Sequence, residues 1–351
     1  MLVYIHIPYC DSKCYYCSFN SYTSLFHTKN SYMSALEINL EYELERFNVQ
    51  IGDIESIFIG GGTPSTIEPD LYKNIFKKLN RFIDKDIEIT VEANPNSASI
   101  NWLDGIFNLG VNRISFGVQS FNNKKLKILN RTHSFKDAVK AIQNANRVGF
   151  KNISIDLIYG LSSDTEELLK DDIDRAFNLP INHISTYELT IEDNTKFSKN
   201  PNIKIDNDNL GYLIRDEVSK RGFEQYEVSN YGRYKSIHNL GYWKLKDYIG
   251  VGAGAVGFLK DKRLYPNRDI LEYIKKPNFI KNEELTQQDI FLEKIFLGLR
   301  SEIGVKKDIL TDDIQKKANI LVEEGKLTLK NNIYKNQNFF ISDEIALYLI
   351  G

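Results

Sequence analysis

Short apolar runs alternate with longer amphipathic stretches from the start of the chain to about residue 222. The apolar runs predict six strands, at 3–7, 56–62, 88–94, 113–119, 153–160 and 183–190. Apolar residues at three- and four-residue spacing predict helices between them, at 31–48, 69–83, 100–108, 135–148, 165–178 and 207–221. This α/β alternation is typical of βα units around a parallel sheet, which form either an open barrel or a doubly wound sheet.

Residues that can bind ligands gather where these strands are predicted to end. They are Cys10 after the first strand, Gly60 to Thr63 at the second, Glu92 and Asn94 at the third, Gln119 at the fourth and Asp156 within the fifth. Barrels and doubly wound sheets both bind ligands beyond the carboxyl ends of their strands. We therefore expect one site at this end of the sheet.

The βα rhythm stops after residue 222, and two further regions are expected. Residues 223–283 contain HNLGYW and a glycine-rich GVGAGAVGF run, and predict a β-rich extension with a tight loop. Residues 284–351 predict two helices followed by a hairpin that turns on Asn331 and Asn332, a winged-helix-like module. The expected domains are thus 1–222, 223–283 and 284–351.

Charge and hydropathy exclude some classes of partner. The chain carries 45 Lys and Arg against 47 Asp and Glu, and this balance removes the electrostatic argument for a nucleic-acid or anionic-membrane partner. No apolar run reaches the roughly 18 residues of a membrane span, and the N-terminus lacks the pattern of a signal peptide. The expectation is a cytoplasmic protein without a membrane span.

The three cysteines of the chain, Cys10, Cys14 and Cys17, have the spacing C-x3-C-x2-C directly after the first predicted strand. An odd, clustered set in a reducing compartment indicates metal binding or catalysis before disulfides. Three thiolates suit an iron–sulfur cluster that keeps one iron open. A structural zinc site would need a fourth ligand, for which His6 or His27 could serve. The residues alone leave both alternatives open.

The runs YIHIPYCDSKCYYCSF, GGGTPS at 60–65 and VEANP at 91–95 resemble the radical S-adenosylmethionine superfamily. The resemblance implies a partial (β/α)6 barrel with a 4Fe-4S cluster on Cys10, Cys14 and Cys17, whose open iron binds S-adenosylmethionine. It also implies Tyr16 beside the adenine and Tyr4 near the methionine carboxylate. The run GGGTP adds a physical reason, because Gly61 and Gly62 permit close approach of the backbone and the Thr63 hydroxyl can bond the ligand.

The resemblance narrows to the HemN-like branch and covers nearly the whole chain. It places four polar residues in the pocket for S-adenosylmethionine, namely Glu92, Gln119, Arg131 and Asp156. Glu92 is expected to accept from the methionine ammonium and Arg131 to pair with the carboxylate, while Gln119 and Asp156 hold the ribose.

Two features favour the HemW group of heme chaperones within this branch. The decarboxylating enzyme has a fourth cysteine where this chain has Phe19, and HNLGYW at 238–243 resembles a motif of the HemW group. That group binds heme and delivers it to respiratory apoproteins, and His238 is the candidate heme ligand, since imidazole is a good axial ligand. The resemblance therefore predicts a radical S-adenosylmethionine protein without coproporphyrinogen III dehydrogenase activity, and it leaves a homodimer open.

Two alternatives remain. One is the oxygen-independent coproporphyrinogen III oxidase itself, which oxidatively decarboxylates propionates. The other is a pure binding module with a structural zinc.

Overall fold

The computed structural model describes all 351 residues and contains two sheets. The main sheet has twelve strands in the order β12-β11-β10-β9-β1-β2-β3-β4-β5-β6-β8-β7. Its centre is six parallel strands: β1 (Leu2–Ile7), β2 (Ser56–Gly61), β3 (Glu88–Ala93), β4 (Arg113–Gln119), β5 (Asn152–Tyr159) and β6 (His183–Glu188). All six coincide with predicted strands.

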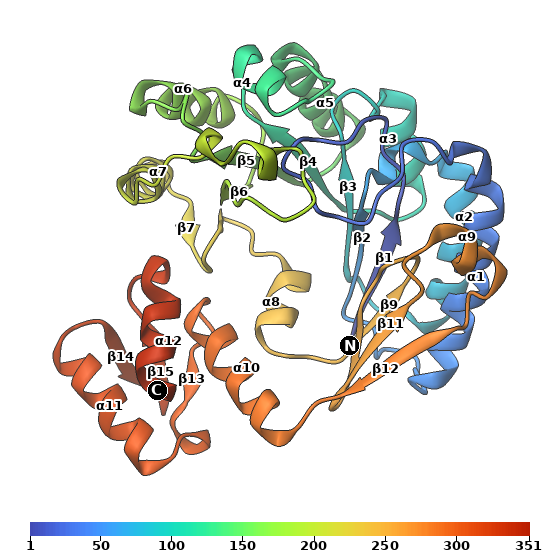
Figure 1. The fold of residues 1–351 in the computed structure, drawn as a ribbon. Helices are drawn as coiled ribbons and strands as arrows, with labels where there is room; N and C mark the ends of the chain where they lie inside the picture. Colours follow the sequence, from blue (N-terminus) through green and yellow to red (C-terminus); the bar gives the residue numbers. More distant parts are fainter.

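Helices line the outside of these strands, as an arc around the barrel (Figure 1). They are α1 (Lys29–Arg46), α2 (Pro69–Leu79), α3 (Ile100–Asn108), α5 (Phe135–Val148), α6 (Glu166–Phe177) and α7 (Asn209–Lys220), each at a predicted position. The short α4 (Asn123–Ile128) was not predicted. The partial (β/α)6 barrel expected from the sequence is confirmed.

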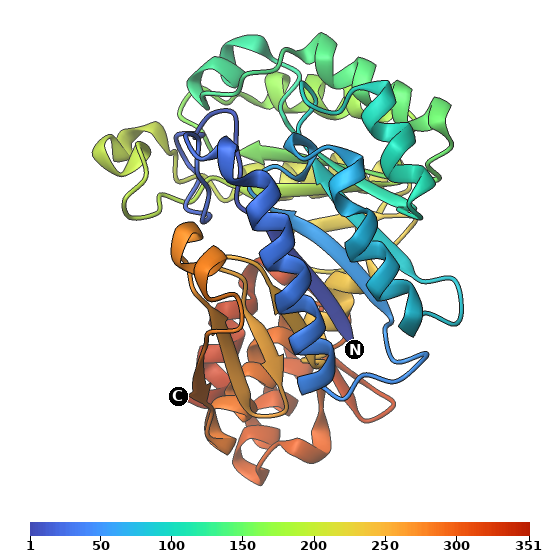
Figure 2. The same ribbon diagram turned by 90° about the vertical axis from the view of Figure 1, so that its right-hand side faces the viewer.

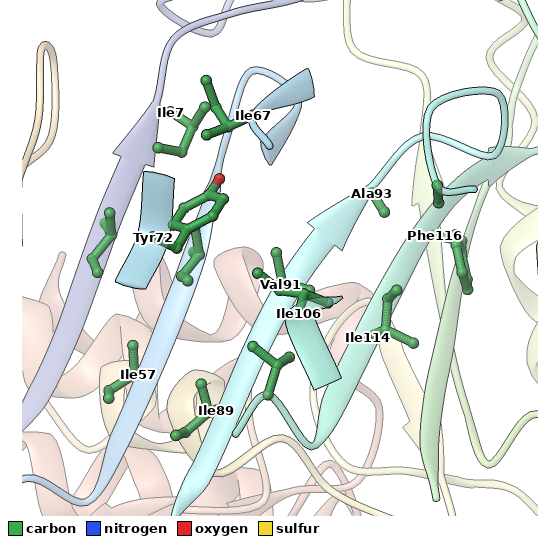
Figure 3. Packing of buried hydrophobic residues seen from close by; sticks show 14 of the residues in the cluster. Ile7, Ile57, Ile67, Tyr72, Ile89, Val91, Ala93, Ile106, Ile114 and Phe116 are labelled. Atoms are coloured by element: carbon green, nitrogen blue, oxygen red, sulfur yellow. The ribbon is translucent and has the colours of Figure 1, made fainter. Parts of the chain in front are cut away.

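The two faces of the central strands have different composition because side chains alternate along a strand. Ile57, Ile89, Val91, Ile114 and Phe116 are buried on the outer face against the helices (Figure 3). The positions between them face the interior of the barrel, and several of these are polar. The outer, apolar face stabilises the barrel by packing against the helices, and the inner face carries polar side chains that can form a binding site.

The segment predicted as a β-rich extension adds strands to both edges of the main sheet. On one edge β8 (Asn230–Gly232) pairs with β6 and β7 (Glu224–Gln225) pairs with β8. On the other, β9 (Tyr248–Val251) runs parallel to β1 and is followed by β10 (Gly257–Leu259), β11 (Lys262–Pro266) and β12 (Ile280–Glu284). Two helices interrupt these strands, α8 (Ile237–Trp243) and α9 (Ile270–Lys275).

The C-terminal residues form a small module with its own core. It contains α10 (Gln287–Leu299), β13 (Val305–Lys306), α11 (Asp312–Glu323), β14 (Leu327–Lys330), β15 (Ile333–Asn336) and α12 (Ser342–Ile350). The hairpin turns on Asn331 and Asn332, which confirms the predicted turn, and both residues have positive φ. Helix α12 is not among the predicted helices. The domain boundaries at 222 and 283 remain predictions.

The C-terminal module lies below the barrel in both views, at the end of the strands opposite to the cysteine loop (Figures 1 and 2). None of the helices has both the length and the apolar character needed to cross a membrane.

Candidate functional site

The cysteines lie on a loop without helix or strand between β1 and the first helical turn. The loop is closed by Cys10 N, which donates to Tyr22 O at 3.1 Å. It is braced by Lys13, whose ammonium donates to Phe19 O at 2.6 Å and to Ser21 Oγ at 2.7 Å. These bonds hold the thiol-bearing backbone in a fixed curve at the carboxyl end of β1.

A cavity of about 430 Å³ lies inside this curve. The structure brings together there every residue that the resemblance assigns to a cofactor, except Tyr4 and His238, whereas Gly60 lies outside the lining. The lining includes Cys10, Cys14, Cys17, Tyr16, Gly61, Gly62, Thr63, Glu92, Gln119, Arg131 and Asp156. We call this cavity the cysteine pocket.

The thiols of the cysteine pocket have polar neighbours from other elements. Thr63 Oγ1 donates to Cys10 Sγ at 3.4 Å, and Arg131 Nη1 donates to Cys14 Sγ at 3.3 Å. Burial raises the pKa of the Cys10 and Cys17 thiols, and the Thr63 hydrogen bond opposes this at Cys10. Donors aimed at sulfur favour the thiolate, which is the form that binds metal.

The surroundings fit a ligand set of three sulfurs better than a four-ligand zinc site. His6 does not line the cysteine pocket, and its ring nitrogens are bonded to the Tyr4 hydroxyl at 3.0 Å and to Asn20 O at 2.8 Å. His27 is exposed and also lies outside the pocket. No group of three or more His, Cys, Asp or Glu side chains converges as the ligands of a single ion would. The donor set is therefore suited to an iron–sulfur cluster bound through three of its irons.

Arg131 adds a positive charge to the lining of the cysteine pocket. Its Nη2 donates to Asn94 Oδ1 and to Gly117 O, both at 2.6 Å, and Asn94 Nδ2 donates to Thr63 Oγ1 at 3.2 Å. The buried Nε has no partner within the chain. Arg131 lines the cysteine pocket, so its charge would attract a carboxylate bound there.

Glu92 and Asp156 supply two half-buried acids to the same cavity. Gly61 N donates to Glu92 Oε2 at 3.1 Å, and Ser115 Oγ donates to Asp156 Oδ1 at 3.4 Å. Burial, with repulsion from Asp156, raises the pKa of Glu92 to about 8, and burial raises the pKa of Asp156 to about 6. Two acids without a paired cation favour a ligand that carries positive charge, such as an ammonium or a sulfonium.

Unusual backbone conformations at the ends of β2 and β4 help to position the residues that line the cysteine pocket. Gln119 has φ of 66°, in the left-handed region that non-glycine residues rarely adopt, beside an irregular register between β4 and β5. At Gly62 a Cβ would lie 2.7 Å from Tyr9 O, so glycine is needed for the end of β2 to pack on the start of the cysteine loop. The glycine run therefore has a packing role besides the predicted approach to a ligand.

The comparisons with known proteins agree with this geometry. Residues 4–176 match the family model of the radical SAM superfamily. A protein named heme chaperone HemW from Lactococcus lactis subsp. lactis is 34% identical over 317 residues, covering 86% of this chain and 82% of that protein. The chain belongs to the HemW family of the radical SAM superfamily.

Other matches support this assignment. The heme chaperone HemW of Escherichia coli is 36% identical over 281 residues, covering 78% of this chain and 73% of that protein. A solved structure of coproporphyrinogen III oxidase (HemN) from Escherichia coli, described as a radical SAM enzyme, has a TM-score of 0.82 at 21% identity. It covers 99% of this chain and 89% of that one, and confirms the fold of this HemW family member.

The HNLGYW motif of this HemW family member lies on α8, away from the cysteine pocket. The His238 side chain is fully buried, with Nδ1 bonded to Ser56 Oγ at 2.8 Å and Nε2 to the Tyr242 hydroxyl at 3.0 Å. Burial lowers the pKa of His238 to about 3, so the ring is neutral. Both nitrogens are engaged, and ligation of heme iron, which stays a prediction, requires the bond to Tyr242 to open.

Tyr4 is the other predicted residue outside the cysteine pocket. It lies on β1, donates to or accepts from His6 Nδ1 at 3.0 Å, and faces a neighbouring cavity. Its predicted place near the methionine carboxylate also stays a prediction.

Several lining residues of the cysteine pocket had no predicted role, among them Ser115, Gly117, Tyr187 and Glu188. Period-two alternation on the predicted strands could have found some of them. Ser115 and Gly117 precede Gln119 at alternate positions of β4, so all three face the interior. Tyr187 and Glu188 are the last two residues of β6, and adjacent side chains of a strand point to opposite faces, so alternation alone does not place both in the pocket.

Replacing Glu92 with glutamine is expected to flatten the pH dependence of stability in the ligand-free chain. The unfolded carboxyl ionises near its ordinary value of 4.5, while the folded one keeps its proton to about pH 8. The folded state therefore binds the extra proton in this interval, and the free energy of unfolding falls as pH rises. Between pH 5 and 8 we expect wild type to lose roughly 2–4 kcal/mol more than E92Q in urea unfolding.

The matched control is E45Q, which changes an exposed glutamate of α1. It should follow wild type across the pH series. An E92Q profile as steep as that of wild type would show that Glu92 is not the group responsible.

Proposed function

We propose that this chain binds heme and delivers it to respiratory apoproteins in the cytoplasm, and that it carries a 4Fe-4S cluster and S-adenosylmethionine in the cysteine pocket. The observation that carries the proposal is the agreement of its relatives. Proteins from Lactococcus lactis, Bacillus subtilis, Haemophilus influenzae and Escherichia coli that match most of the chain share the name heme chaperone HemW.

The side chains of the cysteine pocket suit the two cofactors. Cys10, Cys14 and Cys17 would hold three irons and leave the fourth for S-adenosylmethionine. Once bound, cluster and S-adenosylmethionine supply one-electron chemistry, and the protein provides binding and orientation.

The remaining residues would orient S-adenosylmethionine. The positive charge of Arg131 suits the methionine carboxylate, and the acid Glu92 suits the ammonium. Gln119 and Asp156 are available to the ribose hydroxyls. Tyr16 packs beside a small apolar group that includes Leu129 and Ile158, and would flank the adenine.

Phe19 argues against the decarboxylase alternative. It lines the cysteine pocket where the resemblance places a fourth cysteine in the enzyme, and it is 66% exposed. The position offers apolar surface at the mouth of the pocket and no thiol.

Titration of the anaerobically purified chain with heme tests the proposal. A saturable Soret band with submicromolar to micromolar Kd is expected. Conversion of coproporphyrinogen III to protoporphyrinogen IX under reducing conditions would overturn the proposal in favour of the oxidase. In the same titration H238A should shift the Soret band, and an unchanged band would remove His238 as the ligand.

A further inference from the structure

A second and larger cavity, of about 1160 Å³, lies beside the cysteine pocket. Its walls come from β1, α8, β9, β11, β12 and α10. Figure 1 shows β9, β11 and β12 beside β1 at one edge of the sheet, with α8 and α10 towards the C-terminal module. Ligand sites for small molecules usually span about 300–1000 Å³. This space therefore has room for a ligand as large as a metalloporphyrin.

Two strongly exposed aromatic side chains stand at this cavity. Phe19 is 66% exposed and Phe279 is 56% exposed, and they are the only phenylalanines among the large apolar residues on the surface. Both line the same cavity, although they lie 260 positions apart in the sequence. Exposing two flat apolar rings at one cavity costs free energy, and a flat apolar ligand would recover it.

Further aromatic side chains form the inner wall. Tyr242 of α8 packs edge-on against Tyr248 of β9 with ring centroids 4.7 Å apart, and both line the cavity with Tyr4. The Tyr242 hydroxyl also bonds His238, so the candidate iron ligand lies directly behind this wall.

Two cations at the rim have no acidic partner in the chain. Arg268 and Lys281 are exposed and form no salt bridge, whereas Arg263 in the same cavity is held by both carboxylate oxygens of Glu293 at 2.6 Å. The one acid of the lining, Glu283, accepts from the Tyr265 hydroxyl at 2.6 Å. Two free cations beside an aromatic cavity match a flat apolar molecule with two carboxylates.

The position of Arg268 depends on the cysteine loop. Its carbonyl oxygen accepts from Asn20 Nδ2 at 2.8 Å and from the Tyr22 hydroxyl at 3.0 Å. Ser18 and Phe19 of the same loop line both cavities. The loop that bears the thiols therefore also forms part of the larger cavity and anchors one of its cations.

We propose that heme binds in this larger cavity, with its ring between Phe19, Phe279 and the tyrosine wall and its two propionates on Arg268 and Lys281. The inference rests on the proposed function and locates the cargo site. It also explains why the position of the missing fourth cysteine carries an aromatic ring, since Phe19 would contact the porphyrin.

Heme titration of R268E/K281E tests the charge pair. We expect its Kd for heme to be roughly tenfold above that of wild type, because two charge-assisted contacts become repulsive. The matched control is K85E/K330E, which reverses two exposed, unpaired lysines far from the cavity and makes the same change in net charge. This control should stay within about twofold of wild type.

Heme dimethyl ester, in which both propionates are neutral, serves as the second probe. Wild type should bind the ester more weakly than heme, but more tightly than R268E/K281E binds heme, because the ester removes the attraction and adds no repulsion. The two proteins should bind the ester equally. A third variant, F19A/F279A, should weaken binding of both probes, because it removes ring contact and leaves the charges in place. The affected side chains are exposed, and circular dichroism checks that each variant is folded.

The outcomes distinguish an error in the location of the heme site from an error in the proposed function. If wild type binds heme and R268E/K281E behaves like its control, heme lies elsewhere and this inference is overturned while the proposed function stands. If wild type does not bind heme at all, the proposed function fails and the inference fails with it.

Discussion

Each of the single variants C10S, C14S and C17S is expected to lose its iron–sulfur cluster after anaerobic reconstitution. Three thiolates are the whole protein ligand set available in the cysteine pocket, and a serine hydroxyl is a hard ligand that does not replace a soft thiolate. Wild type should be brown and hold about four irons per chain, and each variant should hold less than about one. Iron analysis and visible absorption measure the difference.

The control for these variants is S12A, a change in the same loop that leaves the thiols in place. It should keep the iron content of wild type, and circular dichroism should show that all four variants are folded. A colourless wild type that contains about one zinc per chain would contradict the cluster and favour the structural zinc alternative.

The barrel could be predicted because its signals are local. Each central strand alternates an outer isoleucine or valine with an inner residue, and each outer helix repeats its apolar positions over several turns. In β3, for example, Ile89 and Val91 face the helices while Glu88 and Glu92 face inward. Helix α4 escaped prediction because six residues are too short to establish a period.

Helix α8 could not be predicted, because distant residues determine its position and its N-terminus. Ser236 caps it locally by accepting from Asn239 N at 3.3 Å. The residue that receives its first amide groups is Glu88, about 150 positions earlier in the chain. A seven-residue helix is also too short for its apolar positions to establish a period, so the cap alone does not predict it.

The candidate site likewise has a part that local sequence signals predict and a part that depends on contacts between distant residues. The cysteine spacing and the strand-end polar residues predicted one pocket, because parallel strands bring their carboxyl ends to one edge. His238 is hydrogen-bonded to Ser56, 182 positions away, and the larger cavity is lined by residues from six separate helices and strands. Spacing along the chain carries no information about such contacts, so their roles required the fold.

Replacing Glu88 with alanine is expected to destabilise the chain by about 3–5 kcal/mol. The carboxylate is 2% exposed and accepts four hydrogen bonds. Its Oε2 accepts from the Tyr234 hydroxyl at 2.8 Å and from Ile237 N at 2.9 Å, and its Oε1 accepts from His238 N at 3.0 Å and from Ser236 Oγ at 3.2 Å. The variant E88A leaves four donors inside the barrel without an acceptor. Urea unfolding followed by circular dichroism measures the loss.

Two further variants separate the hydrogen bonds from other effects of the substitution. E88Q keeps one acceptor oxygen and nearly the same volume, so its loss should fall between those of wild type and E88A. E45A removes an exposed glutamate of α1 and should change the free energy of unfolding by less than about 0.5 kcal/mol. If E88A unfolds like E45A, the packing of His238 and Tyr242 holds α8 without Glu88. Because Tyr242 of α8 forms part of the aromatic wall of the larger cavity, a loosened α8 in E88A should also weaken heme binding, whereas E45A should not.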